Sequence, residues 1–190
     1  MKKDILVAGV GGQGILTVAY VLDNASMEAG LYLKQTEVHG MAQRGGGVVS
    51  HVRISDKPIH SDMIPQGKAD IVLGVEPLEA LRYANYLVPN GIIISNTEPF
   101  NNIPNYPEIE KVLESIKKYK NILINANELA KEAGSVNAQN VVLIGALSHF
   151  LPISCDCIIK WIKNLFEAKG EKFVELNLKA FQTGRESVKL

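Results

Sequence analysis

The sequence predicts an α/β fold in which a mostly parallel sheet is covered by helices on both faces. Short apolar runs rich in β-branched residues alternate along the chain with segments of helical periodicity. Such runs are typical of buried parallel strands, and their alternation with helices is typical of crossover connections. From residue 137 onward the pattern is helical throughout. We therefore expect a single domain over residues 1–190, with a sheet core over 1–136 and a helical cap or interface segment over 137–190.

The first half of the chain starts with an apolar segment, residues 4–10, that ends in glycines and predicts a buried strand. Apolar residues at helical spacing follow from Gly14 to about Gly30. A short second strand is expected at 31–36. The partly alternating segment 48–54 predicts a third strand, because a Ser-Asp-Lys-Pro turn sequence comes directly after it.

The second half repeats this pattern. The run DIVLGV at 70–75 predicts another buried strand, and Pro77 suits the first position of a helix over 77–87. A turn at Pro89-Asn90-Gly91 leads into the next apolar run. The same criteria predict the remaining elements: strands at 92–95 and 121–125, an irregular Pro- and Asn-rich loop at 99–107, and helices at 108–119, 127–133, 138–150, 155–169 and 171–188.

Composition and charge exclude several classes of protein. Lys+Arg and Asp+Glu both count 20, whereas nucleic-acid binding usually requires a basic excess. No apolar run is long enough to span a membrane, and the N-terminal run breaks at Gly9 without a signal-peptide cleavage site. The thiols of Cys155 and Cys157 are too few for an iron–sulfur cluster and are expected to be packing or surface groups. We expect a cytoplasmic chain that binds neither nucleic acid nor membrane.

The first glycine cluster, GVGGQG at 9–14, follows a strand and opens a helix, as in Rossmann-like folds. Glycines permit a tight turn, and the free N–H groups of a helix start favour an anion. A dinucleotide site also needs an acidic ribose ligand, for which Glu37 is the nearest candidate, although it does not end its strand cleanly. A dinucleotide site, another phosphate site and a purely structural turn all remain open. The candidate ligand-binding residues here are Gly9, Gly11, Gly12, Gln13 and Gly14.

The second cluster places Arg44 against Gly45, Gly46 and Gly47. A guanidinium suits phosphate or carboxylate, and glycines leave the backbone free to form an anion-binding nest. The alternative is a surface arginine beside a flexible loop. Both clusters should lie at the carboxyl edge of the sheet, where open α/β sheets bind ligands. We therefore add Arg44, Gly45 and Gly46 to the candidate binding residues.

Other polar residues have weaker assignments. His39 is the one candidate for a catalytic contact, and with His51 it is too isolated from carboxylates and thiols to form a metal site. His60 is expected to be exposed and His149 to pack or cap a helix. Glu76 is expected to cap the helix that follows it, and Asn96 and Thr97 are candidate polar liners of the carboxyl edge.

Three segments taken together resemble a known family. LVAGVGGQGIL, EVHGMAQRGGGVVSHVRI and ADIVLGVEPLEALRY are similar to the gamma-type domain of 2-oxoacid:ferredoxin oxidoreductases, and most closely to beta subunits of the indolepyruvate enzymes. The resemblance covers about residues 1–150 in order, and the string EVHGMAQRGG is its most specific part.

The resemblance implies a role within a larger enzyme. Such complexes decarboxylate an arylpyruvate on thiamine diphosphate, pass electrons through iron–sulfur clusters to ferredoxin, and release an acyl-coenzyme A. The thiamine, its Mg²⁺ and the clusters are expected in a large partner subunit, and this chain is expected to hold none of them tightly. In agreement, the sequence lacks four-cysteine runs and a convincing thiamine diphosphate motif.

Several questions remain open from the sequence. The glycine clusters could bind coenzyme A or only the partner subunit. A stand-alone NAD- or FAD-dependent oxidoreductase and a non-catalytic binding module are the alternative functions. The sequence does not specify which 2-oxoacid is used or what Cys155 and Cys157 do. A homodimer of the isolated chain, formed through the surface meant for its partner, is a further expectation.

Overall fold

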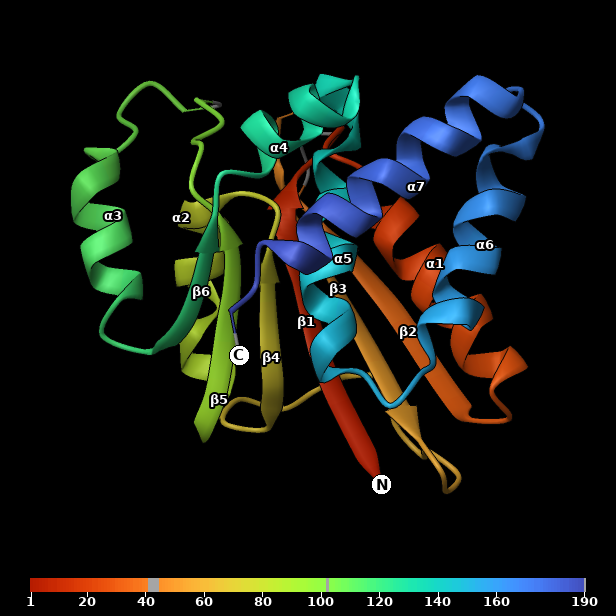
Figure 1. The fold of residues 1–190 in the computed structure, drawn as a ribbon. Helices are drawn as coiled ribbons and strands as arrows, with labels where there is room; N and C mark the ends of the chain where they lie inside the picture. The colour runs from red at the N-terminus through yellow and green to blue at the C-terminus, as the bar shows by residue number, and fades with distance from the viewer. Residues whose placement is uncertain (41–44, 102, 190) are drawn as a thin grey trace.

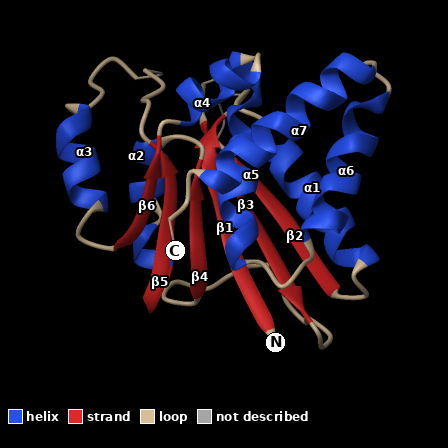
Figure 2. Cartoon of the chain, viewed as in Figure 1, coloured by secondary structure: helices blue, strands red, loops and turns tan. Residues whose placement is uncertain are grey.

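The computed structural model describes residues 1–40, 45–101 and 103–189. Within these residues, six strands form one sheet in the order β2-β3-β1-β4-β5-β6 (Figures 1 and 2). The strands are β1 (Lys2–Val10), β2 (Tyr32–His39), β3 (Gly47–Ser55), β4 (Ala69–Gly74), β5 (Leu87–Asn96) and β6 (Lys120–Ile124). The α-helices are α1 (Ile15–Glu28), α2 (Pro77–Arg82), α3 (Ile109–Ile116), α4 (Ala126–Ala133), α5 (Gln139–Leu147), α6 (Cys155–Glu167) and α7 (Glu171–Glu186). Short 3₁₀ helices occur at Ala84–Tyr86, Val136–Ala138 and Ser148–Phe150.

The sheet is mixed rather than fully parallel. β1, β4, β5 and β6 run parallel, whereas β3 is antiparallel to both β1 and β2. Only residues 40–46 connect β2 to β3, whereas a parallel pair would need a crossover of about a dozen residues or more. The predicted α/β class, with a mostly parallel sheet and a helical C-terminal segment, is confirmed. The expectation of parallel pairing does not hold for β3.

Helices cover both faces of the sheet, as the alternating pattern predicts. Along β1, Ile5 and Val7 join the larger apolar cluster, which is built with α1, α4, α5, α6 and α7. Leu6 points to the opposite face and joins a smaller cluster with α2 and α3. Figure 1 shows α1, α5, α6 and α7 together on one side of the sheet. The core therefore consists of two layers of side chains separated by the strands.

The C-terminal helices pack closely on this larger layer. At the crossing of α5 and α7, a Cβ on Gly145 would lie 2.1 Å from the Phe181 carbonyl oxygen, and one on Gly184 would lie 1.9 Å from that of Val142. The two helix backbones therefore touch, which only glycine permits at these positions. α6 packs on α1, where the two carboxylate oxygens of Glu28 accept hydrogen bonds from Lys160 and Trp161, each at 2.7 Å. The division of the domain between residues 136 and 137 stays a prediction.

The structure changes the assignment of two expected elements, besides small shifts at the ends of others. The residues of the expected turn at Pro89-Asn90-Gly91 belong to β5, which starts at Leu87. The register between β4 and β5 shifts between Ala69 and Ile71, so the strand accommodates a proline at an irregular stretch. The helix expected over 77–87 is α2 followed by the 3₁₀ turn. In the described part of the chain, no helix is both long enough and apolar enough to cross a membrane.

A buried ion pair ties β1 to β3 near the amino edge of the sheet. The Asp4 side chain is fully buried, and Arg53 donates to its two oxygens at 2.9 and 3.1 Å. Lys2 adds a contact of 2.6 Å from its ammonium nitrogen to Asp4 Oδ2. Arg53 also donates to the carbonyl oxygens of Ser61 and Met63, which fixes the connection from β3 to β4. One guanidinium thus stabilises both a strand pair and a loop.

Replacing Arg53→Ala should lower the free energy of unfolding by about 3 kcal/mol, because it leaves a buried carboxylate with only Lys2 as a partner. Urea denaturation of the purified chain measures this. The control is Lys111→Ala, which removes a solvent-exposed ion pair to Glu108 and should cost less than about 1 kcal/mol. Equal losses in the two variants would contradict this interpretation of Asp4.

The carboxyl group of Asp23 on α1 lies in a different environment. Its Oδ1 atom is buried and has no hydrogen-bond partner in the described part of the chain. Burial disfavours the charged form and raises the pKa of Asp23 to about 7. The folded state therefore binds this proton more tightly than the unfolded state. The stability that results is present at low pH and is lost as the pH rises through about 7.

The free energy of unfolding should therefore fall between pH 5 and pH 8, by an amount on the order of 3 kcal/mol from this group. Asp23→Asn should remove most of that pH dependence, and denaturation at the two pH values measures it. Asp156→Asn, a change of an exposed carboxyl on α6, is the control and should leave the pH dependence intact. The assignment is wrong if Asp23→Asn behaves like this control.

Candidate functional site

The turn between β1 and α1 is closed by one side chain. The Oε1 atom of Gln13 accepts a hydrogen bond from the Val10 N–H at 2.8 Å, and the Gln13 N–H donates to the Val10 carbonyl at 3.0 Å. Gly12 and Gly14 have φ angles of 102° and 79°, a region that strongly favours glycine. The G-x-G-x-x-G segment therefore forms the tight strand-to-helix turn that its sequence predicts. Gln13 is the residue that holds this turn closed.

The outer side of the turn leaves backbone donors open. In the described part of the chain, the N–H groups of Gly12 and Gly14 have no hydrogen-bond partner, and no side chain caps the start of α1. A Cβ placed on Gly12 would meet no atom within 4 Å, so this stretch of backbone faces open space. The N-terminus of α1 also carries the positive end of the helix dipole. This combination suits a negatively charged group.

The two glycine clusters lie side by side. The Gly11 N–H donates to the Gly46 carbonyl at 2.9 Å, and Val10 pairs with Gly47 where β1 meets β3. The Gly40 N–H donates to the Gly47 carbonyl at 3.1 Å. Both clusters therefore occupy the carboxyl edge of the sheet. Arg44, the candidate guanidinium of this edge, lies outside the described residues.

A first hollow of about 340 Å³ opens beside the glycine turn on the β2 side. The side chain of Glu37, only 9% exposed, contacts the imidazole of His39, which is 59% exposed. Apart from that contact, the Glu37 oxygens have no hydrogen-bond partner among the described residues. His39 and Glu37 thus both line the hollow. The full lining is Gly11, Gly12, Gly14, Ile15, Leu16, Glu37, His39 and Val48.

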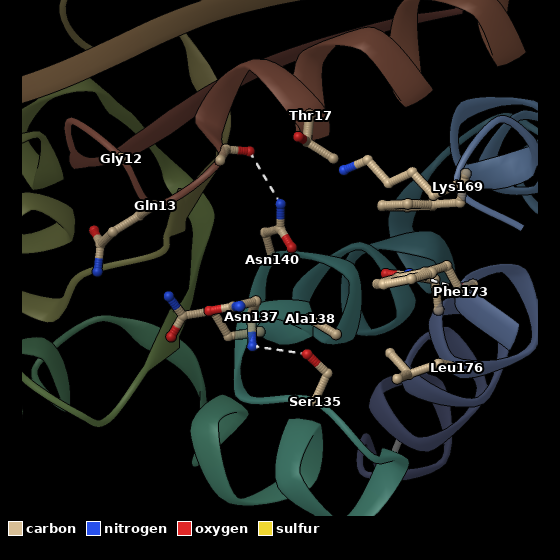
Figure 3. A pocket seen from close by; sticks show the side chains of 14 residues that line it. Gly12, Gln13, Thr17, Ser135, Asn137, Ala138, Asn140, Lys169, Phe173 and Leu176 are labelled. Carbon is tan, nitrogen blue, oxygen red and sulfur yellow. Dashed lines mark hydrogen bonds between the residues drawn. The ribbon is translucent and has the colours of Figure 1, made fainter.

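A second hollow of about 320 Å³ lies on the other side of the turn, between the starts of α1 and α5 and the C-terminal helices (Figure 3). The Asn140 side chain lies at the base of this hollow. Its orientation is fixed by two hydrogen bonds, because it donates to the Gly14 carbonyl at 3.2 Å and accepts from the Val141 N–H at 2.9 Å. Lys169 and Phe173 extend into it from the side of α6 and α7. Gly12 and Gly14 line both hollows, so the glycine turn separates them.

Gly14 has a second role that the sequence does not reveal. A Cβ at this position would lie 2.3 Å from the Asn140 side-chain nitrogen. The third glycine of the motif therefore allows close approach of α5 in addition to its positive φ angle. This contact joins residues that are 126 positions apart in the chain.

Several other candidates serve the fold. His51 is buried, its Nδ1 accepts from the Ile64 N–H at 3.0 Å, and burial lowers its pKa. His149 contacts the Arg185 carbonyl, and His60 is exposed, as expected. Glu76 accepts from the Glu79 N–H at 2.8 Å and caps α2, and burial raises the pKa of its carboxyl group.

Asn96 stabilises the fold through hydrogen bonds, and its side chain is not available to line the carboxyl edge. Its side chain is buried and hydrogen-bonds to the backbone of Val75 and Ala126 and to the side chain of Asn127. The N–H of Thr97 donates to the Ile124 carbonyl at 2.9 Å. Among the described residues, no group of three His, Cys, Asp or Glu side chains could hold a metal ion.

Sequence reasoning missed Asn140, Lys169 and Phe173, because their position beside the glycine turn depends on helix packing over long sequence distances. No local motif marks any of them. A dinucleotide site would require an acidic residue at the carboxyl edge of the sheet, and Glu37 lies there. However, β3 lies between β2, the strand that carries Glu37, and β1. In a dinucleotide-binding Rossmann fold the corresponding strand lies directly beside the first.

Comparison with known proteins places the chain in a family. The family described as pyruvate ferredoxin/flavodoxin oxidoreductase matches residues 4–187. The indolepyruvate oxidoreductase subunit IorB of Archaeoglobus fulgidus is 41% identical over 97% of this chain and 94% of its own length. The corresponding subunit of Pyrococcus horikoshii is 40% identical over 100% of this chain and 98% of its own length.

Solved structures show the same fold. The pyruvate oxidoreductase subunit PORC of Thermotoga maritima matches with a TM-score of 0.78 at 22% identity, over 99% of this chain and 97% of that chain. The 2-oxoglutarate:ferredoxin oxidoreductase of Magnetococcus marinus, solved with 2-oxoglutarate, coenzyme A and succinyl-CoA bound, matches with a TM-score of 0.79 at 24% identity. The match covers 98% of this chain but 31% of that one. The chain therefore belongs to the pyruvate ferredoxin/flavodoxin oxidoreductase family, as a small subunit of an indolepyruvate-type 2-oxoacid:ferredoxin oxidoreductase.

Proposed function

We propose that this subunit supplies the coenzyme A-binding edge of an arylpyruvate:ferredoxin oxidoreductase. The observation that carries the proposal is that, among the described residues, the N–H groups of Gly12 and Gly14 have no partner at the start of α1, which no side chain caps. The diphosphate of coenzyme A would bind there, with Arg44, Gly45 and Gly46 from the adjacent loop. The coenzyme A bound in the Magnetococcus marinus enzyme supports the choice of ligand.

The physical basis is charge and access. Each contact between an anion and a helix N-terminus contributes about 0.3–1 kcal/mol, and more where the geometry is partly buried. The absence of a side chain at Gly12 lets phosphate oxygens approach the backbone directly. Holding coenzyme A at this edge would orient its thiol for the acyl group formed in the partner subunit. Fixed orientation of two reactants is itself a large contribution to rate.

In this proposal, electron transfer through iron–sulfur clusters takes place in the large partner subunit. An iron–sulfur cluster needs four thiolates, whereas this chain offers Cys155 and Cys157, both on α6. Its donor groups therefore do not fit a cluster. We assign thiamine diphosphate, Mg²⁺ and the clusters to a large subunit, and ferredoxin would be reached through the complex.

A second role for the same edge is docking of the large subunit. Leu16 is 61% exposed on α1 and lines the hollow that contains Glu37 and His39. An exposed leucine beside the glycine turn suits contact with another polypeptide. Coenzyme A and the partner could share this edge, with the ligand held between the two chains.

Gln13→Glu should weaken coenzyme A binding about tenfold, equivalent to ~1.4 kcal/mol. The new carboxylate keeps an oxygen that can accept from the Val10 N–H, so the turn is retained while a negative charge is added beside the diphosphate. Isothermal titration calorimetry on the assembled complex measures the change. Gln66→Glu, an exposed site between β3 and β4 at the opposite edge, is the control and should bind normally.

Arg44→Ala provides the outcome that would reject a coenzyme A site. If the complex shows no heat on titration with coenzyme A, and Arg44→Ala retains full activity, the edge serves only to dock the partner.

Omitting this subunit should abolish 2-oxoacid-dependent reduction of ferredoxin by the large subunit, because coenzyme A would no longer be held beside the acyl group. The assay compares the large subunit alone with the same preparation after this chain is added back. Undiminished turnover without the chain would make it a non-catalytic accessory module.

A further inference from the structure

The outer edge of β2 is long, regular and uncovered. Among the described residues, β2 is the last strand on its side of the sheet, and it pairs with β3 over all eight of its residues without a register shift (Figure 1). Edge strands are usually short, or carry a proline, a bulge or a charge that blocks pairing with another strand. β2 has no proline, and its one lysine, Lys34, donates to the His60 carbonyl at 3.4 Å. This edge is therefore open to strand addition.

One hydrogen bond shows which backbone groups of β2 face the open edge. The Gly40 N–H donates to the Gly47 carbonyl at 3.1 Å, one position beyond the last listed β2–β3 pair, so these two residues occupy a hydrogen-bonded position of the ladder. Hydrogen-bonded and non-hydrogen-bonded pairs alternate along antiparallel strands. The N–H and C=O groups of Leu33, Gln35 and Glu37 therefore point away from β3, where a further strand can bond to them.

The exposed apolar side chains of β2 are placed symmetrically about Gln35. Tyr32 is 51% exposed and Val38 is 47% exposed, and each lies three positions from Gln35. If a second copy pairs antiparallel with Gln35 opposite its own counterpart, Tyr32 of each copy lies opposite Val38 of the other. Aromatic and β-branched side chains are favourable cross-strand partners. Lys34 then faces Thr36, whereas a shift of two residues would place Lys34 opposite Val38.

Helix α1 extends the same surface. It packs on β2 and β3, and the large apolar side chains of Tyr20 and Met27, seven positions apart on one face, are exposed. Because strands lie about 4.8 Å apart, a helix seated over β2 and β3 is about 5 Å from a two-fold axis at the outer edge of β2. The α1 helices of two copies would then lie about 10 Å apart, a normal distance for packed helices.

We propose that two copies of this chain associate through the outer edge of β2, with their sheets joined across a two-fold axis at Gln35 and their α1 helices packed side by side. Such an interface is isologous, because each copy contributes the same residues. The joined strands are antiparallel, so the carboxyl edges of the two copies lie at opposite ends of the pair. The inference goes beyond the proposed function and does not depend on coenzyme A binding.

The first test is the association of the purified chain. Analytical ultracentrifugation should show an equilibrium between monomer and dimer. Val38→Lys should raise the dissociation constant about a hundredfold, because the symmetric interface then contains two unpaired charges. Val136→Lys, the same substitution at a valine that is 52% exposed and lies outside β2 and α1, is the matched control and should leave the constant unchanged. A monomer at every concentration, or equal effects of the two variants, would overturn the proposal.

The second test is the register of the joined strands, measured in the assembled complex. Opposite residues of a non-hydrogen-bonded antiparallel pair have Cα atoms about 4.5 Å apart, within reach of a disulfide. In a background of Cys155→Ser and Cys157→Ser, the double variant Tyr32→Cys and Val38→Cys should form a disulfide-linked dimer on mild oxidation, seen on a non-reducing gel. These two positions are roughly 20 Å apart within one strand, so they cannot bond inside one chain.

The control for the register is the double variant Lys34→Cys and Val38→Cys in the same background. It corresponds to a pairing shifted by two residues and should give no linked dimer. A disulfide in this control but not between positions 32 and 38 would exclude a two-fold axis at Gln35 and overturn the proposal.

The comparison with the isolated chain distinguishes a second copy from the other candidate occupant of this edge, the large subunit. If the disulfide between positions 32 and 38 forms in the isolated chain but not in the assembled complex, the large subunit covers β2 and the inference is overturned. Neither result changes the expected affinity for coenzyme A, so the proposed function is tested separately.

Discussion

The hydrogen bond from the Val10 N–H to the Gln13 side chain is the contact on which the arrangement of the carboxyl edge depends. It closes the turn from the inner side, so the turn needs no ligand to hold its shape. The backbone donors of Gly12 and Gly14 are consequently left on the outer side, at the start of a helix that no described side chain caps. Preorganisation of this kind lowers the ordering cost of binding.

The antiparallel strand β3 brings the second glycine cluster to the first. Because β3 runs beside β1 in the opposite direction, its start lies next to the end of β1, and Gly46 can accept from Gly11. A parallel strand in this position would place its start at the far edge of the sheet. The antiparallel direction of β3 thus brings both glycine clusters to the carboxyl edge of the sheet, where Glu37 and His39 also lie.

Much of the fold could be predicted from local pattern. The apolar runs identify β1 and β4, and the glycine motif with Pro77 marks the starts of α1 and α2. The direction of β3 could not be predicted, because a two-residue alternation is the same for parallel and antiparallel pairing. Within the site, the turn itself was predictable. The positions of Asn140, Lys169 and Phe173 could not be predicted, because helix packing brings them to the turn and no local sequence motif indicates it.

The touching backbones of α5 and α7 at Gly145 and Gly184 have a consequence for how such a subunit can diverge. Both clashes that a larger side chain would create are with main-chain atoms, so a compensating change elsewhere cannot relieve them. The packing of α5 on α7 therefore tolerates few substitutions at these two glycines. The short connection from α6 to α7, residues 168–170, is exposed and carries no such restriction.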